Sequence, residues 1–335
     1  MVLIALLALL FSLQSPPAGA PDPAQARQQR QELEARERSA RLAKLDKEWK
    51  SFEVAPFLVL SERQDALARQ AAADSVILWK WMGETFPTFA PESYAPTPIL
   101  CVHSDEDGAG SDGYVEGGYV FAGEGPYVLS IYPAPFLASN VRRRVAEAWF
   151  QAKDRDLYFA LPGWMRAGLV EVLADARTKG GRLILKPDTD TLNDFAGLMR
   201  EDKLIPLRKF LKQPLARAAS EGEGRDRRFS PSPQAGQFVR YLLAGKGAKG
   251  AKTSKILPDT LAALSAKLPA LAWEVDAALK EAGVSASAPE WSERRAREFE
   301  KLEARVLPEV FEAVFADWTD KDWDALIEGY KFDKF

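Results

Sequence analysis

Histidine and cysteine are almost absent from this chain. Among its 335 residues, His103 is the only histidine and Cys101 the only cysteine. Any site built from two histidines is therefore excluded, and no Ser-His-Asp triad is credible. One cysteine also excludes an intramolecular disulfide framework, and none follows the N-terminal segment at a position suited to lipid attachment.

An excess of charge of one sign is lacking too. The 45 Lys and Arg residues nearly balance the 48 Asp and Glu residues, and the formal net charge is −3. Such a balance provides no general attraction to nucleic acid or to an anionic membrane. The aromatic residues are spread over predicted helices rather than interleaved with basic ones, so we expect no nucleic-acid partner.

The N-terminal segment has the features of an export signal. An apolar run over residues 2–13 is followed by Ser-Pro-Pro and the small-residue sequence Ala18-Gly19-Ala20. The run is too short to span a bilayer, and the small residues fit a signal-peptidase site. No Lys or Arg precedes the run, which leaves an uncleaved anchor as the alternative. We predict a signal peptide over residues 1–20, no stable membrane span, and a secreted or periplasmic protein.

A highly charged segment follows. Glu32/Arg36, Glu34/Arg38 and Glu37/Arg41 are opposite charges four residues apart, which stabilises a solvated helix. We predict a helix over residues 24–50 and treat residues 21–52 as a charged surface helix, docked through a narrow apolar stripe that includes Trp49. A coiled coil is disfavoured because the heptads are not sustained.

Strand patterns come early in the rest of the chain and helix patterns come late. The predicted strands cover residues 57–61, 98–102, 118–122, 127–132 and 182–186, with the third and fourth forming a hairpin at Gly123–Gly125. The predicted helices cover residues 63–86, 139–152, 164–176, 191–200, 205–212 and 234–244. Residues 219–233 and 244–254 have loop-like composition. This order indicates an α+β fold rather than alternating α/β.

The last third of the chain is predicted to be helical. Its strongest signal is an apolar stripe at spacings of three and four, formed by Leu307, Val310, Phe311, Val314, Phe315 and Trp318. Residues 281–335 are accordingly interpreted as a C-terminal helical extension.

The helices over 139–152 and 164–176 flank a short turn at Leu161-Pro162-Gly163-Trp164. This pair resembles exported zinc metallopeptidases of the gluzincin, peptidase-MA-like type. In that family the first helix contains His-Glu-x-x-His, whose histidines lie on one helix face and bind zinc while the glutamate activates water. The second helix begins with Pro-x-Trp-hydrophobic-x-Glu-Gly, and its glutamate is the third zinc ligand.

The alignment places apolar residues at every ligand position. The histidine positions correspond to Ala146 and Phe150, and the ligand glutamate corresponds to Ala167. Glu147 remains at the general-base position. No residue, Glu147 included, is assigned a catalytic role.

Three further residues support the second motif: Pro162, Trp164 and Gly168. The resemblance covers about residues 55–275 and implies a peptidase-MA-like domain over 53–280. The implied fold is a thermolysin-like core, with a small mixed sheet, a helical bundle and extra helices at both termini.

For four other candidate sites, the residues fit a purely structural role better than they fit ligand binding. The acidic segment 105–116 matches a calcium loop only in part, so a solvated loop is preferred. Cys101 and His103 provide two ligands at most, and residues 245–253 miss the phosphate-loop pattern because Ala251 interrupts it. Glu171 lies one turn after Ala167, but lacks further oxygen donors for a hard cation.

The resemblance implies a non-catalytic pseudo-metallopeptidase without cofactor or metal that binds a peptide or protein in the former cleft. Two alternatives remain open. One is a residual or atypical hydrolase that uses Glu147, and the other is a scaffold whose helices at residues 24–50 and 288–330 make the contacts.

Overall fold

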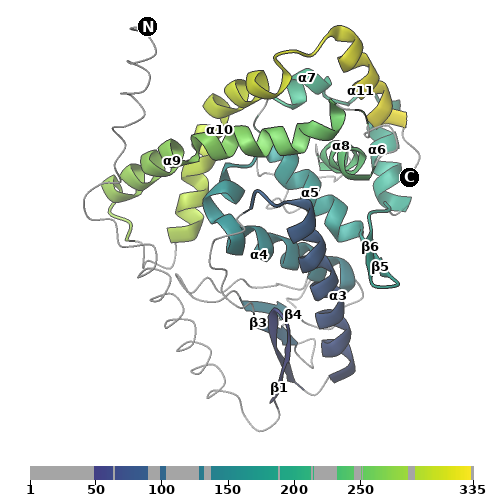
Figure 1. Cartoon of the computed structure of the whole chain (residues 1–335), viewed down its shortest axis with the longest axis vertical. Coiled ribbons are helices and arrows are strands. Elements are labelled where there is room, and N and C mark those ends of the chain that lie inside the picture. The colour runs from purple at the N-terminus through teal and green to yellow at the C-terminus, as the bar shows by residue number, and fades with distance from the viewer. Residues whose placement is uncertain are drawn as a thin grey trace, which may run out of the picture.

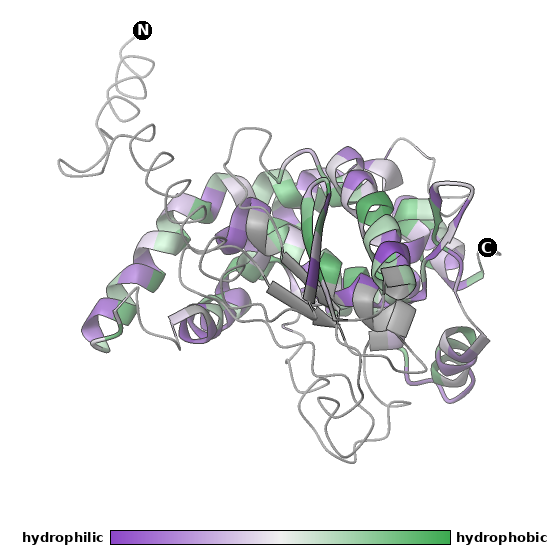
Figure 2. Ribbon diagram, turned by 90° about the horizontal axis from the view of Figure 1, so that it is seen from below, coloured by the Kyte–Doolittle hydropathy of each residue, from purple (hydrophilic) through white to green (hydrophobic). Residues whose placement is uncertain are grey.

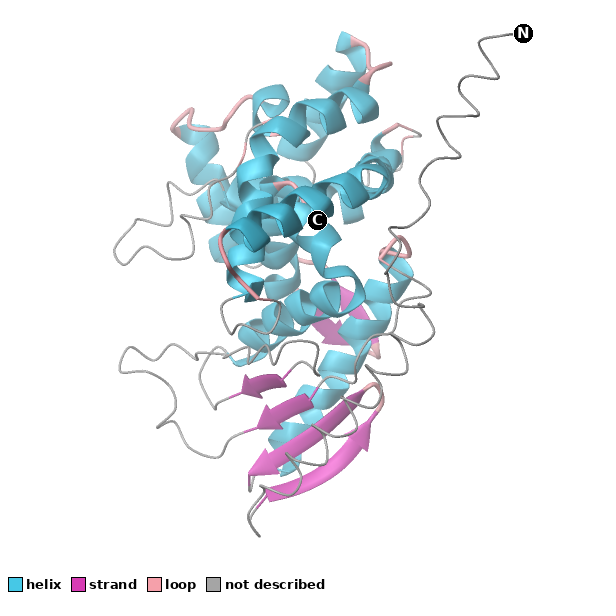
Figure 3. Ribbon diagram, turned by 90° about the vertical axis from the view of Figure 1, so that its left-hand side faces the viewer, coloured by secondary structure: helices cyan, strands magenta, loops and turns pink. Residues whose placement is uncertain are grey.

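The structure is a computed structural model in which most of the chain after residue 48 is described. The described residues are 49–62, 65–89, 99–102, 128–131, 137–187, 189–212, 214, 232–244, 250, 252–285 and 291–332. A small sheet lies at one end of the molecule and helices fill the remainder (Figures 1 and 3). The helix α11 (Asp320–Phe332) lies toward the opposite end (Figure 1). The predicted α+β fold class is confirmed.

Four strands form a mixed sheet in the order β1-β2-β3-β4. Their bounds are β1 Trp49–Val54, β2 Phe57–Glu62, β3 Ile99–Val102 and β4 Val128–Ile131. β1 and β2 are antiparallel, whereas β2, β3 and β4 are mutually parallel neighbours. The successive residues Phe57–Ser61 of β2 are all buried, so both faces of this strand are covered. The helix α3 (Asp65–Thr85) packs against this sheet.

Three helices form the centre of the molecule: α4 (Leu137–Ala160), α5 (Gly163–Asp175) and α8 (Ser232–Ala244). α4 is interrupted at Asp154, whose backbone is not helical. The Asp154 side chain accepts the Leu157 N–H through Oδ1 at 2.9 Å, so it caps the short helix that follows. The predicted helix end at residue 152 therefore coincides with a real interruption.

A second, two-stranded sheet follows α5. β5 (Arg177–Lys179) and β6 (Arg182–Ile184) are antiparallel and are joined by Gly180-Gly181. Both glycines have positive φ, 58° and 72°, as a two-residue hairpin turn of type I′ requires. The helices α6 (Thr189–Arg200) and α7 (Leu207–Phe210) come next.

The C-terminal part contains η4 (Thr253–Lys255), α9 (Ile256–Glu281), α10 (Trp291–Phe315) and α11 (Asp320–Phe332). The predicted apolar stripe is confirmed. Its five residues on α10 are buried, namely Leu307, Val310, Phe311, Val314 and Phe315, and Trp318, just after the helix, is half-buried. Along the helices, hydrophobic and hydrophilic residues alternate as amphipathic packing requires (Figure 2). α10 packs against α9 and α4, so it is part of the main body.

Two sequence predictions need correction or remain open. The helix predicted over 24–50 is wrong at its end, because Trp49 and Lys50 belong to β1 through pairing with β2. Its earlier residues lie outside the described part. The predicted hairpin also stays a prediction, because residues 118–122 are not described and β4 pairs in parallel with β3.

Among the helices in the described part of the chain, none has both the length and the hydropathy that crossing a membrane requires.

Candidate functional site

The paired helices α4 and α5 pack along each other in opposite directions. Only Leu161 and Pro162 separate Ala160, the last residue of α4, from Gly163, the first residue of α5. Near the other end of the pair, Arg142 Nη2 donates a hydrogen bond to the Ala174 carbonyl at 3.2 Å. The candidate site is therefore built on an antiparallel helix pair.

The two residues of α4 that the alignment matches to histidines are fully inside the protein. Ala146 is 1% exposed and Phe150 is 2% exposed, and both belong to the main hydrophobic core. Glu147, the residue at the general-base position, is half-buried. The helix thus buries both residues that the alignment matches to zinc-binding histidines.

Phe150 is surrounded by other aromatic rings. Its ring stacks on Tyr158 at a centroid distance of 5.7 Å and an interplanar angle of 14°. Phe86 and Phe89 lie 5.4 Å and 4.9 Å away, and the neighbouring Trp149 lies 5.3 Å away. A histidine at this position would lose these favourable ring contacts, and its polar imidazole would be buried away from water.

Ala167, the third aligned residue, lies half-buried on α5 and packs against the same core. Glu171, one turn later, is also half-buried, and its Cβ lies against α8, 3.0 Å from where a side chain on Gly236 would begin. That Ala146, Phe150 and Ala167 form one site stays a prediction, although they lie on two helices in contact.

The motif residues at the start of α5 have packing roles. Pro162 is the N-cap residue, with φ −52°, and Trp164 packs edge-on against Phe238 of α8 at 5.4 Å. Gly168 allows α8 to approach closely: a Cβ there would lie 2.5 Å from the Ala235 carbonyl oxygen and in collision with Val239 Cγ2. The glycine is needed because the backbone of α8 occupies that space.

The first turn of α5 is held by a carboxylate from the C-terminal part of the chain. Glu303 of α10 accepts the Gly163 N–H through Oε1 at 2.6 Å, and Arg166 forms an ion pair with Glu300 at 3.5 Å. Burial raises the pKa of Glu303, with Glu300 adding to the rise, while the Gly163 N–H and Arg166 oppose it. Sequence analysis missed this residue.

A sequence signal for Glu303 exists in the spacing of α10. Glu303 lies four residues after Phe299 and four before Leu307, both of which are buried, so it falls on the apolar face of the helix. A carboxylate on such a face needs a hydrogen-bond donor. The identity of the donor, 140 residues away in sequence, becomes visible only in the structure.

We expect Glu303→Gln to stabilise the protein progressively, relative to wild type, as pH rises above about 4.5. The pKa of folded Glu303 lies above the usual glutamate value of 4.5, so the native state binds this proton more tightly than the unfolded state does. The wild type therefore loses stability as pH rises through that window, whereas Gln does not titrate and keeps an oxygen for Gly163. Denaturant unfolding at several pH values measures the trend.

Two controls accompany this prediction. Glu303→Ala removes the acceptor and is expected to cost about 1 kcal/mol at acidic pH, as loss of a helix cap does. Glu328→Gln, at an exposed position of α11, is the matched control for the same change of side chain on the surface. A flat stability difference between wild type and Glu303→Gln would contradict the proposed contact.

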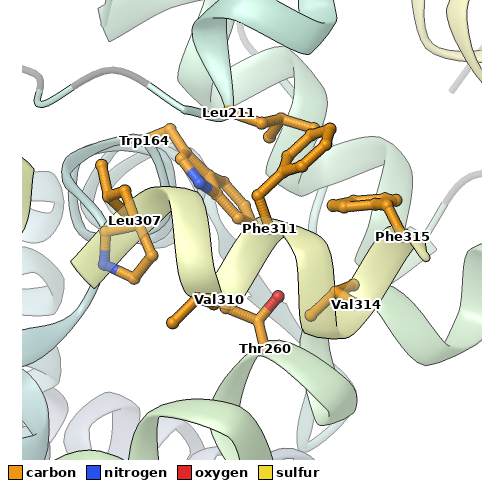
Figure 4. Close-up of a pocket in the computed structure, with 9 residues that line it drawn as sticks. Trp164, Leu211, Thr260, Leu307, Val310, Phe311, Val314 and Phe315 are labelled. Atoms are coloured by element: carbon orange, nitrogen blue, oxygen red, sulfur yellow. The ribbon is translucent and has the colours of Figure 1, made fainter. Parts of the chain in front are cut away.

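A small apolar pocket lies beside the start of α5 (Figure 4). Its lining consists of Pro162, Trp164, Leu211, Thr260, Leu307, Val310, Phe311, Val314 and Phe315. Its empty volume is about 230 Å³, open mouth included. Thr260 is the one hydroxyl in the lining, so this pocket offers little polar recognition.

Several other sequence candidates fall outside the described residues, namely His103 and the acidic segment 105–116. Cys101 lies in β3. In the segment resembling a phosphate loop, Lys252 is already engaged: its Nζ donates to the Asp317 carbonyl and to Asp322 Oδ2, both at 2.8 Å. Within the described residues, no cluster of three or more His, Cys, Asp or Glu side chains is placed to hold a metal ion.

Comparisons of this chain with protein-family models, curated proteins and solved structures found no match.

Proposed function

We propose that this protein is an exported pseudopeptidase, a thermolysin-like core without zinc that binds a peptide or protein segment and does not cut it. The chemistry of the three aligned ligand positions carries this proposal. Ala146, Phe150 and Ala167 have no side-chain atom that binds a metal. Hydrolytic zinc sites need three protein ligands and a water molecule.

Burial supports the non-catalytic part of the proposal. Ala146 and Phe150 are only 1% and 2% exposed, and aromatic rings surround Phe150. Without a zinc-bound water, Glu147 has no acidified water molecule from which to remove a proton as a general base. The family's helix pair would then be retained for its packing and for the surface beside it.

The position of β4 supports an extended peptide as the ligand. β4 is the terminal strand of the described sheet, and it contacts α4. An edge strand presents backbone N–H and C=O groups that can pair with an added strand. An extended peptide would lie along β4, next to the first of the paired helices.

The competing scaffold hypothesis has less surface available than the sequence implies. The apolar faces of α10 and α11 are already buried in the main body, including Phe299, Val310 and Trp323. A partner would have only their outer faces to contact. The region before residue 49 lies outside the described part.

Metal analysis of the purified full chain, combined with a casein-cleavage assay, tests the loss of catalysis. We expect substoichiometric zinc and no chelator-sensitive cleavage. Stoichiometric zinc or chelator-sensitive cleavage would overturn the proposal. Cleavage that resists chelator and disappears in Glu147→Gln would instead establish the residual hydrolase.

A restored variant serves as the matched positive control. Combining Ala146→His, Phe150→His and Ala167→Glu is expected to create a zinc site, which titration calorimetry and a zinc-dependent rise in melting temperature would detect. The double variant without Ala167→Glu is expected to bind zinc more weakly. A folded triple variant that binds no zinc would count against the alignment.

Selection from a displayed random-peptide library tests binding. An enriched peptide is expected to slow hydrogen exchange of the β4 amides, and Ala167→Trp is expected to weaken its binding. Ala262→Trp, at an exposed position of α9, is the control for adding a large aromatic ring. The absence of any enriched peptide, or binding without β4 protection, would contradict this part of the proposal.

A further inference from the structure

The β5–β6 hairpin presents two faces of different character. The hairpin projects from the body of the molecule near the start of α6 (Figure 1). Its register pairs Arg177 with Ile184, Thr178 with Leu183 and Lys179 with Arg182. Because side chains alternate across a strand, the middle pair points to one face and the outer two pairs point to the other.

The inner face of the hairpin is attached to the protein. Thr178 and Leu183 are half-buried, and Thr178 Oγ1 donates to Asp74 Oδ1 of α3 at 2.8 Å. β6 also packs against α3. The turn residues Gly180 and Gly181 adopt the positive φ values of a tight hairpin turn. The opposite face is therefore held outward in a defined orientation.

The outer face consists of cations around one apolar residue. Arg177, Lys179 and Arg182 are exposed, and Ile184 retains 40% of its surface. Lys186, two residues beyond Ile184, is exposed as well. Residues 177–186 contain no acidic side chain. Within the described part of the chain, no ion pair neutralises any of these four cations.

This arrangement has an energetic cost in the isolated protein. Lys179 and Arg182 are directly opposite each other, and like charges in that relation destabilise a strand pair. A chain with a net charge of −3 has nonetheless concentrated four positive charges in ten residues. An anionic partner would convert the local repulsion into binding energy.

The chemistry of the hairpin favours a lipid surface over nucleic acid. Residues 177–186 include no aromatic ring on which a base could stack. An apolar side chain among cations is the composition that suits the boundary between headgroups and acyl chains.

We propose that the outer face of the β5–β6 hairpin is a docking surface for the anionic headgroups of a phospholipid membrane. Arg177, Lys179, Arg182 and Lys186 contact phosphates, and Ile184 enters the interface between headgroups and acyl chains. This docking leaves the protein peripheral to the bilayer. It is independent of whether the paired helices bind a peptide.

Vesicle co-sedimentation of the full chain tests the docking surface. The vesicles contain phosphatidylcholine alone or phosphatidylcholine with phosphatidylglycerol, and the neutral vesicles measure any binding through the apolar N-terminal run. We expect preferential binding to the anionic vesicles that is lost at high salt. Each cation near an anionic surface contributes roughly fivefold, so Lys179→Ala with Arg182→Ala should weaken binding by about 25-fold.

The matched control removes two exposed lysines elsewhere, Lys255→Ala with Lys280→Ala, and should change binding little. Arg182→Gln alone should give about a fivefold loss, and unchanged circular dichroism verifies folding of each variant. Equal binding by wild type and the hairpin double variant would overturn the proposal. Tighter binding to a DNA duplex than to anionic vesicles at equal ionic strength would overturn it in favour of nucleic acid.

Discussion

Gly168→Ala is expected to lower the free energy of unfolding by about 3 kcal/mol, at the upper end of the usual cost of overpacking. The added Cβ would lie 2.5 Å from the Ala235 carbonyl oxygen, a backbone atom that cannot rotate away. The helices α5 and α8 would have to separate, and the contact between Trp164 and Phe238 would loosen with them. Chemical denaturation measures the loss.

Gly197→Ala is the matched control for Gly168→Ala. Gly197 lies inside α6, and a Cβ there would meet nothing within 4 Å. Alanine is therefore expected to stabilise the helix by up to about 1 kcal/mol, since it loses less backbone entropy on folding. Equal effects of the two substitutions would show that α5 and α8 are not in close contact at Gly168.

Asp175→Ala is expected to cost about 3–5 kcal/mol, as removal of one partner from a buried ion pair usually does. Asp175 Oδ2 lies 2.7 Å from Arg240 Nη2, and the two side chains are 9% and 0% exposed. Asp175 also attracts Arg142, whose pKa is lowered chiefly by burial, with Asp74 and Asp175 opposing the shift. The substitution removes a carboxylate that forms an ion pair with Arg240 and also attracts Arg142.

Two comparisons make the Asp175 prediction specific. Asp324→Ala, at an exposed position of α11, is expected to change stability by less than about 0.5 kcal/mol. Replacing both partners with apolar residues, Arg240→Met with Asp175→Leu, is expected to cost less than Asp175→Ala alone, because no buried guanidinium remains. A negligible effect of Asp175→Ala would contradict the importance of this pair.

The C-terminal helices are structural components of the candidate site. Glu303 caps α5, and Arg295 binds Asp156 through two contacts of 2.6 Å. Arg295 is itself 4% exposed. Deleting residues 288–330 would remove both contacts and uncover the core. Substitutions on the outer faces of α10 and α11 are therefore better tests of a scaffold role than a truncation.

Much of the architecture was predictable because local periodicity records which face of an element is buried. The spacing of apolar residues predicted the buried stripe of α10 and the paired helices α4 and α5. The early strands and late helices indicated the α+β class. For the candidate site, the sequence determined that Ala146, Phe150 and Ala167 contain no metal ligand.

The tertiary structure alone decided which partner each buried face meets. Trp49 and Lys50 follow a helical pattern but pair with β2, because strand pairing depends on a distant segment. The donor for Glu303 and the approach of α8 to Gly168 are likewise long-range contacts. A sequence specifies locally that a side chain is apolar, small or charged. Distant segments, which only folding brings together, determine how much space surrounds that side chain and which charge lies opposite it.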